Sequence, residues 1–176
     1  MRRQDRTIPA LIALLLAFIA APERPASARV ACPAPMAEGT PPVKAQHIFC
    51  GEINRSGKAV GFHSRPGGSN PDSIDNTRSP RPDPQRPGIY TLSRFRINED
   101  GQSATKALST MFPDHCSAED VLAAIRHAFN TGRRSDGAFS GMSGTRCTDL
   151  NGQAFHIQGF TGTMSGRTFI ITAYPN

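Results

Sequence analysis

Long hydrophobic runs are scarce in this chain, and beyond its first 28 residues no run is apolar enough to span a bilayer. The one early run, "IPALIALLLAFIAA", follows the positively charged "MRRQDR" and precedes the small residues Ala26-Ser27-Ala28. This pattern is typical of a secretory signal peptide, residues 1–28, that is cut near Ala28. The alternative is a short N-terminal membrane anchor. We expect a mature protein that is secreted or periplasmic and has no membrane segment.

The chain also lacks any cysteine pair with the C-x₂-C spacing that many zinc sites use. An even number of cysteines in an exported chain predicts two disulfides, with three possible connectivities. The cysteines are Cys32, Cys50, Cys116 and Cys147. A zinc site is the alternative, with ligands drawn from His47, Cys50, His63, His115 and Cys116. We expect oxidised cysteines, no metal and no cofactor.

Charge is modest, with 19% charged residues and a formal net charge of +6. A mildly basic protein suits a polyanionic partner, but basicity alone does not identify one. Lysine is rare: the three lysines are Lys44, Lys58 and Lys106.

Internal repeats and repeating βαβ units are both absent, so the order of elements decides the fold class. Residues 29–43, "RVACPAPMAEGTPPV", are proline-rich and form a predicted linker, followed by one domain over residues 44–176. Residues 65–88 have the composition of a long loop. Residues 88–97 alternate as a strand, with a possible bulge near Arg94.

The best-defined helix begins after Ser117, which has the N-cap chemistry, and ends near Gly132. Two closing strands flank the turn "TMSGR" as a hairpin. Strands, one helix and more strands predict an α+β fold. Its core is an antiparallel β-sheet with few helices, stapled by disulfides.

Two histidines flank a turn-rich stretch, "HIFCGEINRSGKAVGFHS", at His47 and His63. If they lie on antiparallel strands joined near Arg55, they face each other across the pair. A looser hairpin or a helix-to-strand turn also brings the rings together. Paired imidazoles suit acid–base work near neutral pH. RNA cleavage by its own 2′-hydroxyl needs such a base and acid, plus a cation, and requires no metal.

These blocks resemble the bacterial EndoU-type endoribonucleases over about residues 44 to 176. The matching pieces are His47-Ile48, Gly61-Phe62-His63, "MFPDHCSAEDVLAAI" and the closing Thr172-Ala173-Tyr174-Pro175. The resemblance implies a catalytic triad of His47, His63 and Lys106. An alignment shifted by three residues would put Ser109 in the lysine's place, and an arginine would then supply the charge.

The resemblance also implies that Thr172 and Tyr174 contact the uridine or the scissile phosphate. Thr110 lies four residues after Lys106, and we expect it to help select the base. Cys50 departs from the common family pattern, and we interpret it as a disulfide partner that suits an exported protein, paired with Cys116 or Cys32. The expected activity is cleavage of single-stranded RNA at uridine, leaving a 2′,3′-cyclic phosphate. The protein would then be a toxin or effector with a cognate immunity protein, or a scavenging enzyme. The alternative is a non-catalytic exported module that binds RNA or protein.

Overall fold

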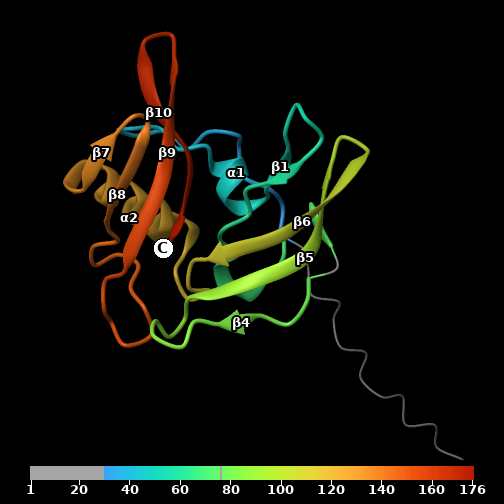
Figure 1. Ribbon diagram of the computed structural model, residues 1–176, viewed down its shortest axis with the longest axis horizontal. Helices are drawn as coiled ribbons and strands as arrows, with labels where there is room; N and C mark the ends of the chain where they lie inside the picture. The colour runs from blue at the N-terminus through green and yellow to red at the C-terminus, as the bar shows by residue number, and fades with distance from the viewer. Residues whose placement is uncertain (1–29, 76) are drawn as a thin grey trace, which may run out of the picture.

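The computed structural model describes residues 30–75 and 77–176, which form an α+β fold with two antiparallel sheets and few helices (Figure 1). The predicted signal peptide, residues 1–28, lies outside the described residues. In the described part of the chain, no helix has the length and apolar character needed to cross a membrane.

One sheet is built from the C-terminal half of the chain. Its strands run in the order β10 (Arg167–Pro175), β9 (His156–Met164), β8 (Ala138–Met142) and β7 (Arg133–Ser135). β9 and β10 form the expected hairpin, whose turn residues Ser165 and Gly166 have φ angles of 50° and 74°. This left-handed pair matches the twist of the strands, as in a type I′ turn.

Helix α2 (Ala118–Thr131) packs on this sheet, mainly against β8. The Ser117 hydroxyl accepts a hydrogen bond from the Asp120 amide at 3.1 Å, as the N-cap pattern predicts. Gly132 caps the other end with an extended backbone, not a left-handed one. A Cβ there would lie 2.2 Å from the Ser140 oxygen, so glycine permits the close approach of helix and sheet.

The second sheet is centred on β5 (Tyr90–Glu99), which pairs along its length with β6 (Gln102–Met111). Two short strands, β3 (Ile74–Asp75) and β4 (Arg81–Pro82), pair with opposite ends of β5. With the 3₁₀ turn η1 (Pro66–Gly68), they give order to the predicted loop 65–88. A two-residue strand at a sheet edge is compatible with the proline content of that segment.

Arg94 interrupts the alternation of β5, as the sequence indicated, but the pairing register does not shift. Ser93 faces Leu108 and Phe95 faces Lys106. Arg94 adopts a left-handed φ of 51°, which moves the buried face from Leu92 to Phe95. There is therefore no bulge here. The left-handed backbone at Arg94 interrupts the alternation of buried and exposed side chains in both β5 and β6, and the pairing register is kept.

Helix α1 (Ala45–Phe49) connects the N-terminal segment to a small ribbon of β1 (Glu52–Ile53) and β2 (Ala59–Val60). α1 contacts β10, and its residues Ile48 and Phe49 belong to the core beneath α2. Residue Phe62, just after β2, belongs to the separate core of the β5–β6 sheet. The chain therefore crosses from one hydrophobic core to the other between residues 49 and 62.

The cysteines form two disulfides, as predicted, and the structure gives their connectivity as Cys32–Cys50 and Cys116–Cys147. The first attaches the proline-rich segment to the end of α1. At the other end of this segment, Val43 is fully buried and forms a bridge with Ile170 of β10.

Candidate active site

The rings of His47 and His63 lie together, with centroids 6.2 Å apart and planes tilted by 33°. The predicted arrangement on two facing strands is wrong, because His47 lies in α1 and the ribbon pairs Glu52 with Val60. The rings meet through a turn that starts from helix α1 and ends just after β2, which is close to one of the two other arrangements that the sequence allowed.

Backbone hydrogen bonds hold this turn. The Phe62 amide donates to the His47 oxygen at 2.7 Å, and the His63 amide donates to the Ile48 oxygen at 2.7 Å. Gly61 makes the approach possible: its φ is 76°, and a Cβ would lie 2.3 Å from the His47 oxygen.

His63 is 8% exposed and takes its orientation from β6. Its Nδ1 lies 3.0 Å from the Thr110 backbone oxygen. A carbonyl only accepts, so Nδ1 carries the hydrogen and Nε2 of the neutral ring holds a free lone pair. Burial lowers the pKa of His63 well below 6.5, and the nearby Lys106 charge lowers it further. The ring is therefore neutral at neutral pH and has the form of a proton acceptor.

His47 is oriented by a carboxylate. Its Nδ1 lies 3.1 Å from Glu52 Oε1, and the other Glu52 oxygen forms an ion pair with Lys44 at 2.6 Å. The hydrogen bond from His47 lowers the pKa of Glu52 to about 2, with a smaller contribution from Lys44, even though burial opposes ionisation. Glu52 was missed in the sequence analysis. Its signal was a carboxylate inside the first block, five residues after the histidine.

Lys106 reaches the same place from β6. Its Nζ donates to the Gly61 backbone oxygen and to Ser109 Oγ, the latter at 3.1 Å. Burial lowers the pKa of Lys106 to about 8. The structure thus brings Lys106 and Ser109, the two residues that competed for one role in the alignment, into contact with each other.

Of the three residues predicted to bind substrate, Tyr174 is the one whose side-chain ring lies against a histidine. Its ring stacks on His63 with centroids 5.2 Å apart and an interplanar angle of 29°. Thr172 lies two residues earlier on β10, and its Oγ1 is buried with no hydrogen-bond partner among the described residues. Thr110 enters the site through its backbone oxygen.

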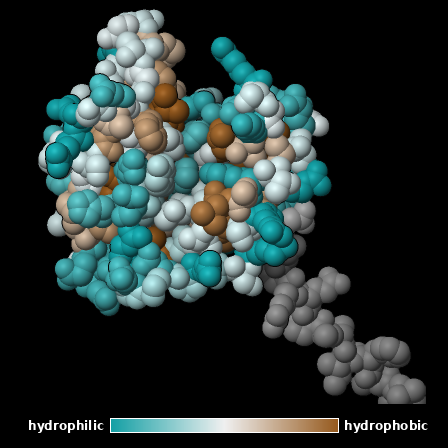
Figure 2. Space-filling view, viewed as in Figure 1, coloured by the Kyte–Doolittle hydropathy of each residue, from teal (hydrophilic) through white to brown (hydrophobic). Residues whose placement is uncertain are grey.

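The site forms where the two sheets meet, because α1 and β10 contribute from one side and β6 from the other. β6 and β10 are in direct contact. Figure 2 shows the surface notched between the β9–β10 hairpin and the β1–β2 ribbon, on either side of α1. His47 and His63 remain 6% and 8% exposed at this junction.

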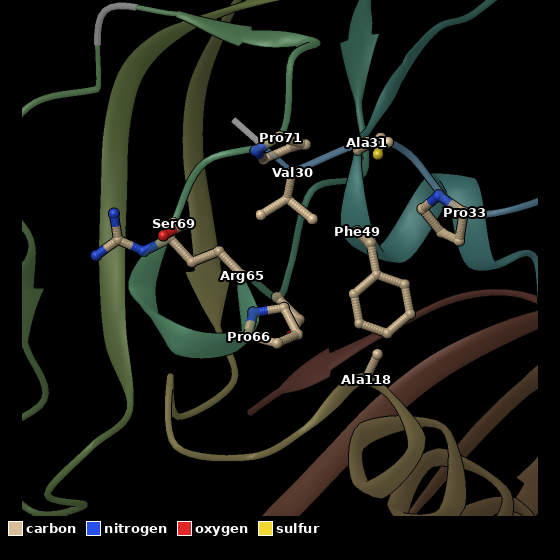
Figure 3. Close-up of a pocket in the computed structure, with 11 residues that line it drawn as sticks. Val30, Ala31, Pro33, Phe49, Arg65, Pro66, Ser69, Pro71 and Ala118 are labelled. Carbon is tan, nitrogen blue, oxygen red and sulfur yellow. The ribbon is translucent and has the colours of Figure 1, made fainter. Parts of the chain in front are cut away.

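A cavity of about 180 Å³ lies next to the C-terminal end of α1. It is lined by apolar side chains, among them Val30, Phe49 and Pro71 (Figure 3). Ser64 also lines it, and the buried Ser64 hydroxyl has no hydrogen-bond partner in the described part of the chain. None of the proposed triad borders this cavity, so it is separate from the candidate site.

The two cysteine ligands of the alternative zinc site, Cys50 and Cys116, are both in disulfides, so neither provides a thiolate for a metal ion. Within residues 30–75 and 77–176, no group of three histidine, cysteine or acidic side chains is arranged to hold a metal ion.

The chain matches the model of a known family. The model of the family described as bacterial EndoU nuclease matches residues 43–176. This span contains His47, His63, Lys106 and the whole of β10. No curated protein matches the chain, and no solved structure matches it.

Proposed function

Because the chain belongs to the bacterial EndoU nucleases, we propose that it is a metal-independent endoribonuclease that cuts single-stranded RNA at uridine. The 2′-hydroxyl of the RNA is the nucleophile, and the products are a 2′,3′-cyclic phosphate and a 5′-hydroxyl. The observation that carries the proposal is the pair of imidazoles 6.2 Å apart beside a half-buried lysine. The preference for uridine rests on the family resemblance.

His63 acts as the general base. Its Nε2 takes the 2′-hydroxyl proton, and the resulting oxygen attacks the adjacent phosphorus. Two features support this role: Nδ1 is occupied by the Thr110 carbonyl, and the lowered pKa keeps the ring neutral at neutral pH.

His47 acts as the general acid. The bond from phosphorus to the 5′-oxygen breaks, and that oxygen takes a proton from Nε2 of the His47 ring. The ionised Glu52 carboxylate occupies Nδ1, so Nε2 is the nitrogen left for this transfer. One proton is removed and one is returned, so the reaction needs no other reactant.

Lys106 stabilises the negative charge that develops on the non-bridging phosphate oxygens. The partial burial of the Lys106 ammonium strengthens its attraction to the phosphate charge, because fewer water molecules screen it. Tyr174 and Thr172 would contact the nucleotide from the facing strand, Tyr174 through the ring that stacks on His63.

Export is part of the same proposal. Two disulfides fit an extracellular or periplasmic protein. We propose that residues 1–28 direct this export and that the nuclease serves as a toxin or effector, with an immunity protein protecting the producing cell.

A cleavage assay tests the activity. The oxidised protein is incubated with a uridine-containing RNA, with and without excess chelator, beside His47→Ala, His63→Ala and the control His156→Ala. His156 is exposed on β9, outside the site. Cleavage by the parent and the control but by neither site variant, with a cyclic phosphate seen by mass spectrometry, supports the proposal. An inert parent that still binds RNA indicates the non-catalytic module, and cleavage abolished by chelator indicates a metal-dependent reaction.

A further inference from the structure

The Ser109 hydroxyl has an unusual set of neighbours for a side chain that is 3% exposed. Its Oγ lies 2.6 Å from the Phe62 oxygen, 3.0 Å from His63 Nδ1 and 3.1 Å from Lys106 Nζ. A hydroxyl can donate one hydrogen bond and accept two, so this one uses its whole hydrogen-bonding capacity.

The chemistry of these partners decides the direction of each hydrogen bond. The Phe62 carbonyl only accepts, so Ser109 gives it the single hydroxyl hydrogen. The Lys106 ammonium only donates, so Ser109 accepts from it. One lone pair then remains, and it faces His63 Nδ1, which must therefore carry a hydrogen. The opposite tautomer would leave the Ser109 and Thr110 oxygens both facing a bare nitrogen lone pair.

The position of Ser109 depends on the irregular backbone conformation at Arg94 in the β5–β6 pair. Residues three apart on a regular strand point to opposite faces. The left-handed Arg94 lies between the paired positions Ser93 and Phe95, and here Lys106 and Ser109 are on the same side and in contact.

Ser109 also supports the strained residue before His63. Phe62 is buried and has a φ of 59°, a left-handed conformation that is unfavourable for a bulky side chain. Its amide donates to the His47 oxygen and its carbonyl accepts from Ser109. This single residue is thereby tied to both halves of the site.

We propose that Ser109 is a positioning residue: its hydroxyl acts with the Thr110 carbonyl to hold His63 in the Nδ1–H tautomer, and it anchors the Lys106 ammonium beside that ring. The catalytic consequence rests on the proposed function, whereas the tautomer is a property of the folded protein alone. A single hydroxyl thus aligns the base and the cation, and it never contacts the substrate.

The test uses pairs of variants that differ only in a hydroxyl. Ser109→Thr and Ser109→Val carry side chains of the same shape, so any packing cost is common to both. Ser109→Ala removes the hydroxyl from the parent. Ser143→Ala is the control, since Ser143 is buried outside the site and accepts a hydrogen bond from the Phe155 amide.

Two measurements separate positioning from a general loss of structure. The first is the nitrogen-15 NMR spectrum of the histidine rings above the titration of His63, which reports the tautomer without any substrate. Free histidine favours the Nε2–H tautomer in water. We expect Nδ1–H at His63 in the parent, Ser109→Thr and Ser143→Ala, and a shift toward Nε2–H in Ser109→Ala and Ser109→Val.

The second measurement is RNA cleavage. We expect kcat to fall about 10- to 100-fold in Ser109→Ala and Ser109→Val with KM nearly unchanged, and to recover in Ser109→Thr. Unchanged ring spectra in both hydroxyl-free variants overturn the proposal, as does equal kcat in the Thr and Val variants. If the parent cleaves no RNA, the proposed function fails, and the ring spectra still decide the role of Ser109.

Discussion

Replacing Lys106 with methionine should stabilise the protein while it removes the activity. Burial lowers the pKa of Lys106 from its ordinary value of 10.5 to about 8. This corresponds to about 3 kcal/mol of unfavourable free energy for holding the charged form in the folded state. Methionine has a similar length and no charge. Its cost is the loss of the hydrogen bonds to Gly61 and Ser109, about 1 kcal/mol each.

We therefore expect Lys106→Met to be about 1 kcal/mol more stable than the parent at neutral pH. The measurement is urea unfolding followed by circular dichroism. The same variant should lose about 100- to 1,000-fold in kcat, since the transition-state charge loses its cation. Lys58→Met is the matched control, because Lys58 is exposed on the turn between β1 and β2, and it should change neither quantity.

The pH dependence of the free energy of unfolding isolates the contribution of Lys106. Between pH 8 and 10.5 the unfolded lysine still holds its proton, whereas the folded one has released it. The unfolded state then binds more protons, so the free energy of unfolding of the parent rises with pH in that window. The rise should be absent in Lys106→Met. A variant that is less stable than the parent, with the same slope between these pH values, would refute the reasoning.

Three further predictions concern the surroundings of the site. The hydrogen bond from His47 lowers the pKa of Glu52 to about 2, so the stability it contributes is present above pH 4.5 and is lost as pH falls toward 2. Urea unfolding across this range should show a smaller loss for Glu52→Gln, and an equal loss would contradict the assignment. Replacing Cys116 and Cys147 together with alanine should lower the free energy of unfolding by about 2–4 kcal/mol in chemical denaturation, and an unchanged midpoint would argue against the cross-link. Tyr174→Phe keeps the ring stacked on the neighbouring imidazole, so it should be more stable than Tyr174→Leu by about 0.5–1.5 kcal/mol in thermal unfolding; equal stability would mean that stacking contributes nothing.

Much of the fold could be predicted because its signals are local. The helix after Ser117 follows from a cap and an apolar periodicity within four turns, and the β9–β10 hairpin follows from a Ser-Gly turn between two alternating segments. The stretch from His47 to His63 was harder to predict. Its turn-forming residues allow several geometries, and α1 is a five-residue helix whose position depends on packing against β10.

The sequence by itself determined the class of fold, the number of disulfides and the family to which the two histidine blocks point. Only the tertiary structure decided which cysteines pair, which nitrogen of His63 bears the hydrogen, and how Glu52 and Ser109 enter the site. The physical reason is distance along the chain. A turn or a cap depends on residues a few positions apart. The pKa of Lys106 and the tautomer of His63, by contrast, depend on contacts between segments about 45 residues apart, which exist only after both cores have formed.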